Sequence, residues 1–465
     1  MMKLSELTRR AWLKNVGLGL GAASVGLGMS ADEVNADFVT KKVATRGTEY
    51  SGKEAVPCKL TNGKILRPAV EIPTISETDV LVVGGGPAGC CAAIAAARNG
   101  VKTTLVERYN HFGGLATGGL VVHILGHWTK TADGEKVQVV QGLGEEMMKR
   151  LEAMPNGICD REFGRNPTVD SEAYKYLLVE MLTEANIEIF LHSWAIDSIV
   201  DDQPDPKTGN PVVKGILIQT KLGPHAILAK QIVDCTGDGD VFATCGCAFT
   251  RRVYHIGLPC RIGNVDKMHP EPGTKVPGHL LGGVTPVKGV RWVNMGGPDA
   301  DGLDVRELTK IELNSRKQIW KNYLQVRNTP GCDDVFLLET APQLGVRITR
   351  VLEGTEEMNL DDAKSGKTYD SCVGYGGAWG GDHIGWQIPY GSLLSKNVEN
   401  ILAAGRCICG APSMSELLRV IPNCWSSGHS AGIAASVAVK SNCTARDVNL
   451  DEVRKVLKAQ GAYLG

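Results

Sequence analysis

Several features are missing from this 465-residue sequence, and each absence removes a class of function. No basic tract stands out and the net charge is only −1, so the composition does not indicate binding to nucleic acid or to an acidic membrane surface. No apolar stretch reaches the roughly 18 residues that a membrane-spanning helix needs. The 14 cysteines include no C-x-x-C or C-x-x-x-x-C pair, which argues against a thioredoxin-reductase-like dithiol.

The N-terminal residues read as an export signal. Residues 8–14 contain the pair Arg9-Arg10 followed by hydrophobic residues, as in twin-arginine signals. A glycine-rich, mildly apolar run spans 16–29, and the small residues around Ala36 suit a signal peptidase. We therefore expect 1–36 to be a signal peptide that sends the folded protein to the periplasm or another extracytoplasmic location. Residues 37–76 read as a polar leader segment.

A dinucleotide-binding pattern begins after the leader. The apolar, β-branched run 79–83 predicts a buried parallel strand, and the glycines of a G-x-G-x-x-G motif follow at Gly84, Gly86 and Gly89. In such a motif the first glycine makes the tight turn, the second lets the backbone approach a diphosphate, and the third allows close contact between helix and strand.

The residues after this motif continue the pattern. Small side chains over 90–98 predict a helix that lies close to the sheet, with its N-terminal amides facing the phosphates. A second strand over 102–106 ends at Glu107, whose carboxylate is placed to accept hydrogen bonds from ribose hydroxyls. Strand, glycines, helix, strand and acid in this order predict a dinucleotide site.

Later segments resemble one family of flavoproteins. The stretch 232–240 ends in Asp-Cys-Thr-Gly-Asp-Gly-Asp, and it is accompanied by the blocks 113–119, 344–350, 388–393, 400–406 and 428–432. Together they resemble FAD-dependent oxidoreductases with a single glutathione-reductase-like FAD domain, a family that includes proteins similar to the flavin subunit of heterodisulfide reductase. The resemblance covers most of residues 77–465, more weakly between 250 and 335.

The resemblance implies an α/β fold in which a Rossmann-like FAD-binding domain carries an inserted α+β substrate domain. We expect the FAD domain at 77–125, 228–250 and 396–440, the cap at 126–227 and 251–395, and a C-terminal helix within 441–465. It also implies that a helix starting near Gly428 directs its N-terminus at the pyrimidine end of the flavin. The expected residues at a non-covalently bound FAD are Gly84, Gly86, Pro87, Ala88, Gly89, Glu107, Arg108, Gly114, Thr117, Thr236, Gly237, Asp238, Gly405, Arg406, Gly428 and Ala431.

The catalytic candidates are Arg347, Arg350, His429 and His383. The two arginines form either a fork for a substrate carboxylate or a flavin oxygen, or an internal salt bridge between domains. Arg419, just before the flavin-facing helix, leans towards cofactor contact. His429 has the best position among the histidines, although a structural role suits it equally well.

Metal binding has little support. His123 and His127 stand four residues apart but lack a third ligand at a motif spacing. Cys245-Gly246-Cys247 and Cys407-Ile408-Cys409 do not form an iron–sulfur run, so buried thiols are the default interpretation and a cluster stays open without a motif.

Two functions fit these patterns. The first is an FAD-dependent oxidoreductase that passes a hydride or electrons between a small organic substrate and an acceptor through flavin N5. Because no second G-x-G-x-x-G follows a strand, the expected partner is not NAD(P) but a quinone, a redox protein or oxygen. The alternative is a flavin-carrying electron-transfer subunit that binds a redox protein.

Overall fold

The computed structural model describes residues 57–130, 135–162, 166–378 and 385–465. The signal expected at 1–36, the first half of the expected leader (37–56) and His383 lie outside these residues. In the four described segments, no helix combines the length and apolar character needed to cross a bilayer. The chain divides into two units, Met1–Pro68 and Ala69–Gly465. The described part of the first unit contains a hairpin of β1 (Lys59–Thr61) and β2 (Lys64–Leu66).

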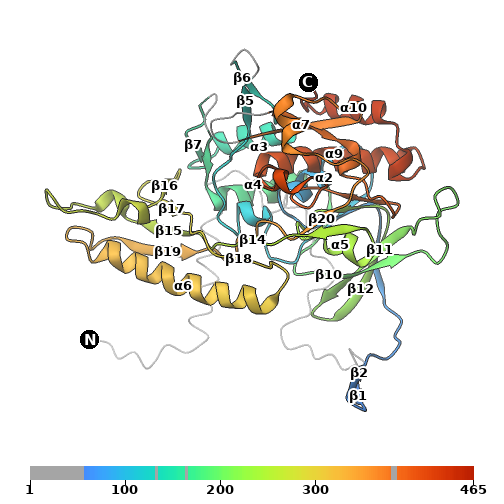
Figure 1. Cartoon of the computed structure of the whole chain (residues 1–465), viewed down its shortest axis with the longest axis horizontal. Coiled ribbons are helices and arrows are strands. Elements are labelled where there is room, and N and C mark those ends of the chain that lie inside the picture. Colours follow the sequence, from blue (N-terminus) through green and yellow to red (C-terminus); the bar gives the residue numbers. More distant parts are fainter. Residues whose placement is uncertain (1–56, 131–134, 163–165, 379–384) are drawn as a thin grey trace, which may run out of the picture. The chain divides into compact units, whose positions relative to one another are not determined.

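A seven-stranded sheet forms the centre of the second unit (Figure 1). Five strands run parallel: β3 (Thr74–Val83), β4 (Thr103–Val106), β9 (Glu188–Phe190), β12 (Gly223–Asp234) and β23 (Ile401–Ala403). The antiparallel strands β10 (Trp194–Val200) and β11 (Val213–Thr220) extend it beside the first half of β12. The last residues of β12 pair with β23 on one side and β3 on the other.

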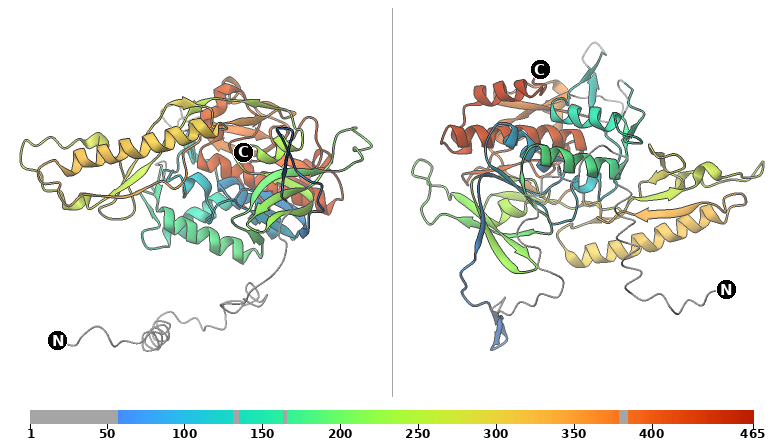
Figure 2. Two further views of the ribbon diagram at one scale, coloured as in Figure 1. Left: turned by 90° about the horizontal axis from the view of Figure 1, so that it is seen from below. Right: turned by 180° about the vertical axis from the view of Figure 1, so that it is seen from behind.

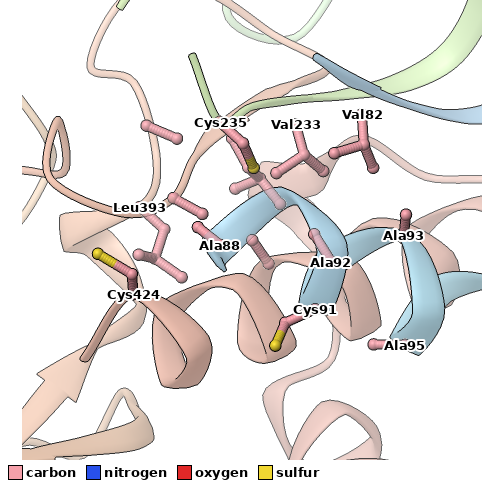
Figure 3. Packing of buried hydrophobic residues seen from close by; sticks show 14 of the residues in the cluster. Val82, Ala88, Cys91, Ala92, Ala93, Ala95, Val233, Cys235, Leu393 and Cys424 are labelled. Atoms are coloured by element: carbon pink, nitrogen blue, oxygen red, sulfur yellow. The ribbon is translucent and has the colours of Figure 1, made fainter. Parts of the chain in front are cut away.

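Two small-residue helices pack against each other over this sheet. Helix α2 (Pro87–Arg98) is buried along Ala88–Ala96, and α9 (Ile421–Lys440) is buried along most of its length. A Cβ at Gly428 would lie 2.1 Å from the carbonyl oxygen of Ala88, so only glycine permits this approach of the two backbones. Figure 3 shows the short side chains of α2, among them Ala92, close to Val82 and Val233 of the strands.

The start of α9 corrects one expectation. The sequence placed a helix start near Gly428, whereas α9 begins at Ile421, with Pro422 in its first turn. Gly428 and Gly432 lie inside the helix and face the backbone of α2. A glycine before an apolar run marks either a helix terminus or a close helix contact, and here it marks the contact.

A second, smaller sheet packs with a long helix and extends away from the central sheet (Figure 2). Its four antiparallel strands, in the order β16-β17-β15-β19, pack with the long helix α6 (Val305–Arg327) around a separate core that includes Leu258, Ile262 and Ile319. The strands are β15 (Cys260–Gly263), β16 (Gly283–Val284), β17 (Arg291–Val293) and β19 (Phe336–Thr340).

Shorter elements connect these parts. The hairpin of β21 (Cys372–Gly377) and β22 (Gly385–Pro389) packs against α9. Helix α10 (Leu450–Ala459) lies within the range 441–465, where a C-terminal helix was expected, and buries Val453 and Leu457. The remaining elements are β5 (Trp128–Lys130), β6 (Lys136–Gln138), α3 (Leu143–Glu152), β7 (Ile158–Cys159), β8 (Thr168–Val169), α4 (Ser171–Glu184), α5 (Asp240–Thr244), β13 (Phe249–Arg251), β14 (Tyr254–His255), β18 (Asp299–Ala300), β20 (Arg350–Leu352), α7 (Leu360–Ser365) and α8 (Ser415–Leu418).

The expected domain limits shift accordingly. Residues 126–227 were expected in the cap, yet β9, β10 and β11 from this stretch belong to the central sheet, and α4 packs against α2. β9 has only three residues, too few to show a periodicity that assigns it to a sheet. β10 and β11 are longer, but they join the sheet through antiparallel pairing with the first half of β12, which no local pattern reveals.

Candidate functional site

A cavity of about 570 Å³ opens at the carboxyl ends of the parallel strands. Gly84 follows β3, Glu107 follows β4, Cys235 follows β12 and Ala404 follows β23, and all four line it. This edge of a parallel sheet is where ligands bind in open α/β folds, because the connecting loops separate there. Residues from the cap close the other side of the cavity.

The glycine turn after β3 shapes one end of the cavity. Gly84 has φ +99°, and a Cβ there would lie 2.5 Å from the carbonyl oxygen of Cys235, so glycine is required. A Cβ at Gly89 would lie 1.7 Å from the Gly84 oxygen, which fixes α2 tightly against the turn. A Cβ at Gly86 would instead project into open space, and among the described residues it would meet only Gly114 Cα, at 4.0 Å.

The first turn of α2 supplies unpaired donors to this end. Gly86 is its N-cap residue, Pro87 follows, and no side chain among the described residues caps the helix. Uncapped amides at a helix N-terminus, together with the helix dipole, favour an anion. Gly86, Pro87, Ala88 and Gly114 all line the cavity as the sequence predicts for a diphosphate site.

Glu107 lies buried at the wall beside the glycine turn. Its Oε2 accepts a hydrogen bond from the Gly85 amide at 2.6 Å and its Oε1 accepts one from the Tyr109 amide at 2.8 Å. These bonds fix the carboxylate at the cavity edge. The neighbouring Arg108 also lines the cavity, and its guanidinium carbon lies 4.8 Å from the Tyr109 ring centroid and 5.8 Å from that of Trp194.

The segments after β12 and β23 meet across the cavity. Arg406 donates from Nη2 to Asp238 at 2.6 Å and from Nε to the Gly237 carbonyl at 2.7 Å. Thr236 belongs to the same turn, and its hydroxyl donates to the buried Asp234 at 2.7 Å. Burial raises the pKa of Asp234 to about 6. Thr236, Gly237, Asp238, Gly405 and Arg406 all line the cavity.

The N-terminus of α9 faces the middle of the cavity. Ile421 and Cys424 line it, and Val420 at the N-cap position provides no side-chain hydrogen bond. The helix end that faces the cavity thus lies seven residues before the expected helix start. Gly428 and Ala431, both expected at the cofactor, do not line the cavity and instead pack inside the helix layer.

The other end of the cavity is formed largely by cap residues. Arg347 lines it and donates from Nη1 to the His255 carbonyl at 2.9 Å. Trp292 stacks on His123 with ring centroids 5.1 Å apart and an interplanar angle of 24°. Further lining residues here are Leu125, His255, Pro259, Asn294, Gln343, Glu416 and Arg419.

Four predicted residues serve other contacts. Arg350 pairs with Asp240 at 3.0 Å, which is the internal salt bridge that the sequence left open for it. The Thr117 hydroxyl donates to the Phe112 carbonyl, and Gly89 packs under the turn. His429 is buried, with Nε2 2.9 Å from the Gln460 side-chain oxygen, and burial lowers its pKa to about 4. None of these four lines the cavity.

The cap residues were largely missed. His123 was considered only as a metal ligand, while His255 and Trp292 were not singled out. His255 lies on β14, which has two residues, and Trp292 lies on β17, which has three. Strands this short show no periodicity that would have marked them. Within the described ranges, no group of three or more His, Cys, Asp or Glu residues is placed to hold a metal ion. Cys245 and Cys247 are buried, with their sulfur atoms 3.6 Å apart.

The residues present fit a dinucleotide with a flavin ring. The open space at Gly86 accommodates the close approach of a diphosphate, and the uncapped α2 faces that position. Glu107 stands on one side of the turn as a hydrogen-bond acceptor. The uncapped N-terminus of α9 suits the negative charge that reduced flavin develops near N1 and O2.

Comparison with known proteins agrees with this fit. The family described as "FAD dependent oxidoreductase" matches residues 79–252 and 275–457, well over half of the chain. Thiamine thiazole synthase from Sulfolobus acidocaldarius is 28% identical over 191 residues, which are 39% of this chain and 62% of that protein. The same enzyme from Metallosphaera sedula is 26% identical over 188 residues, 39% of this chain and 61% of that protein.

These matches span less than two thirds of the relatives' own length. Among solved structures, a geranylgeranyl bacteriochlorophyll reductase-like protein from Thermoplasma acidophilum aligns over 83% of both chains, with 14% identity and a TM-score of 0.42.

Proposed function

This chain belongs to the FAD-dependent oxidoreductase family, and from that premise we propose that it oxidises or reduces a small organic substrate at the cap end of the cavity. The FAD-binding fold and the family support a redox enzyme. The proposal adds the route: a hydride or electrons pass between the substrate and a non-NAD(P) acceptor through flavin N5. FAD supplies that redox chemistry when bound.

Different residues along the cavity would hold different parts of the cofactor and the substrate. The α2 N-terminus and the turn at Gly84–Gly86 would hold the diphosphate, and Glu107 would hold the ribose. The ion pair of Arg406 with Asp238 fixes the middle of the cavity, where the N-terminus of α9 would favour negative charge on the flavin. The cap residues orient the substrate and exclude water.

One observation carries this proposal: the only neighbour that a Cβ at Gly86 would meet within 4 Å, among the described residues, is Gly114 Cα at 4.0 Å. Gly86 and Gly114 therefore leave the space beside the uncapped N-terminus of α2 open, because neither has a side chain. A buried, hydrogen-bonded carboxylate at Glu107 stands next to it.

The acceptor in this proposal is a quinone, a redox protein or oxygen. The sequence has one G-x-G-x-x-G segment after a strand and no dithiol motif. The alternative, an electron-transfer subunit without its own substrate, predicts an exposed flavin edge in a flat apolar patch. The charged and aromatic side chains at the cap end, such as Arg347 and Trp292, favour a substrate pocket.

The test starts from the purified protein and its visible spectrum. We expect flavin absorbance that survives desalting and bleaches anaerobically with one class of organic compound. Reoxidation would then be followed with oxygen, with a soluble quinone and with NAD(P)⁺, of which NAD(P)⁺ should be ineffective. A protein that binds no flavin after gentle preparation would refute the proposal.

Export through the twin-arginine route is part of the same proposal. It rests on Arg9 and Arg10 in the sequence, and it suits a protein that takes up a cofactor before crossing a membrane. Changing Arg9-Arg10 to Lys-Lys should retain the protein in the cytoplasm of a bacterial host. Equal amounts of both forms in the periplasmic fraction would contradict export by this route.

A further inference from the structure

We propose that the cap end of the cavity is a binding site for the carboxylate of a small organic acid, with Arg347 as its anchor. We call this end the carboxylate subsite and define it by Arg347, Arg419, His255, His123 and Trp292. The inference rests on the proposed function and deepens it by naming the substrate class.

The acidic side chains that line the cavity all have partners. Asp238 pairs with Arg406, and Glu416 pairs with Arg419. Glu107 accepts backbone hydrogen bonds at the opposite end. The carboxylates that line the cavity are thus engaged by other groups.

Two arginines that line the cavity, Arg108 and Arg347, form no ion pair with a described residue. Arg108 follows Glu107 at the opposite end and contacts the rings of Tyr109 and Trp194, so Arg347 is the unpaired cation of the cap end. Arg347 donates a hydrogen bond to the backbone carbonyl of His255, and no ion pair forms between Arg347 and any described residue. Burial and the nearby Arg419 lower the pKa of Arg347 to about 10, so the guanidinium is charged at neutral pH. Partial burial of a cation without a counter-ion costs desolvation free energy, and a bound anion offsets that cost.

Arg419 adds a second, partly satisfied guanidinium. It pairs with Glu416 through Nη2, while its Nε is buried and has no hydrogen-bond partner among the described residues. Arg419 directly precedes the N-cap of α9, so the dipole of that helix adds positive potential at the same place. The two arginines and the helix end all favour a single negative charge.

The walls decide what kind of anion fits. Trp292 and His123 provide a stacked planar surface, and Leu125 and Pro259 are apolar. Burial lowers the pKa of both His123 and His255, and for His255 the adjacent Arg347 and Arg419 lower it further. Both rings are therefore neutral near pH 7 and add hydrogen-bonding capacity rather than charge.

These features favour a carboxylate over a phosphate. At this end of the cavity one arginine without an ion pair, Arg347, matches one negative charge, and its planar fork matches the two oxygens of a carboxylate. A phosphate carries close to two charges, and Glu416 at the same wall would repel it. The apolar and aromatic surface suits the carbon skeleton of an organic acid.

The experiment uses two pairs of probes that differ only in charge: benzoate with benzamide, and acetate with acetamide. Binding to the purified full-length protein is measured by calorimetry, and flavin content is read from the absorbance of the same preparation. We expect at least one acid to bind roughly 30-fold more tightly than its amide, the ratio that about 2 kcal/mol from a desolvated charge pair produces.

Three variants test the anchor. Arg347→Gln should weaken binding of the acid by roughly 30-fold without changing binding of the amide, and Arg347→Lys should restore part of it. The matched control is Arg306→Gln, because Arg306 is an exposed arginine on α6 outside the cavity. It should bind both probes as the unaltered protein does. All variants should keep their flavin, since Arg347 does not line the diphosphate end.

The outcomes separate the two proposals. Flavin retained with no preference for either acid over its amide, or with equal acid binding by the Arg347→Gln variant, overturns the carboxylate subsite and leaves the redox function standing. Acid binding that depends on Arg347 in a preparation without flavin overturns the redox function and supports the subsite. If Arg347→Gln does not fold, the comparison of acid with amide on the unaltered protein still decides the matter.

Discussion

Replacing Gly86 with valine should weaken flavin binding by roughly a hundredfold while leaving the fold intact. Gly86 has φ −73° and ψ −173°, a conformation open to any residue, and a Cβ there meets nothing nearer than 4.0 Å. The loss of chain freedom in the unfolded state stabilises the variant by about 0.4–1 kcal/mol. The poorer N-cap destabilises it by about 0.5–1 kcal/mol. These two effects nearly cancel.

The effect on the cofactor should be much larger. The valine side chain would stand between the α2 amides and the diphosphate and remove about two charge-assisted hydrogen bonds. At about 1.5 kcal/mol each this amounts to about 3 kcal/mol, or roughly a hundredfold weaker binding. Flavin absorbance after desalting measures the retained cofactor, and urea unfolding of flavin-free protein measures the fold.

Gly89→Ala is the matched comparison, because it adds a single methyl group three residues away. Its Cβ would lie 1.7 Å from the Gly84 carbonyl oxygen, so the turn or the helix must move. We expect it to lower the free energy of unfolding by about 1–3 kcal/mol. The reasoning fails if Gly86→Val keeps flavin with unchanged affinity, or if it destabilises the flavin-free fold as much as Gly89→Ala does.

Three further predictions concern the interior. Gly432→Ala would place a Cβ 2.2 Å from the Ala92 carbonyl oxygen, so α2 and α9 should separate and thermal unfolding should show a loss of about 1–3 kcal/mol; an unchanged Tm would contradict this contact. Arg406→Gln leaves Asp238 without its ion-pair partner and should cost about 3 kcal/mol in urea unfolding, whereas a loss below about 1 kcal/mol would show that the pair is dispensable. Burial lowers the pKa of His429 to about 4, below the ordinary 6.5, so its contribution to stability is present above pH 6.5 and is lost as the pH falls through about 4. His429→Gln should therefore remove about 2 kcal/mol of the decline in unfolding free energy between about pH 7 and about pH 5, and an unchanged decline would refute its buried neutral state.

The sequence predicted the parts of the site that are local in the chain. β3, the glycine turn, α2, β4 and Glu107 lie within 34 consecutive residues, and each has its own signal in strand, turn or helix chemistry. The resemblance extended this to Thr236–Asp238 and Gly405–Arg406, which follow buried strands. Gly84, Gly86 and Glu107 line the cavity, as do Thr236, Gly237, Asp238, Gly405 and Arg406.

The cap end could not be predicted in the same way. Trp292 and His255 lie on strands of three and two residues, and pairing between distant segments brings them to the cavity. His429 was misplaced because the helix was expected to begin seven residues too late, which turned a packing face into an apparent binding face. Local patterns carry no information about which face of a helix that is buried on nearly all sides meets a ligand.

During synthesis the binding site can be complete only after β12 has paired with both β3 and β23. Val82 and Leu402 flank Val233 in neighbouring strands, although about 320 residues separate them along the chain. A nascent chain on the ribosome therefore lacks one wall of the crevice until its last strand has emerged. A premature stop or a proteolytic cut before Ile401 leaves the glycine turn and Glu107 without Gly405 and Arg406 opposite them. Flavin uptake should therefore require a chain that extends through Gly405 and Arg406.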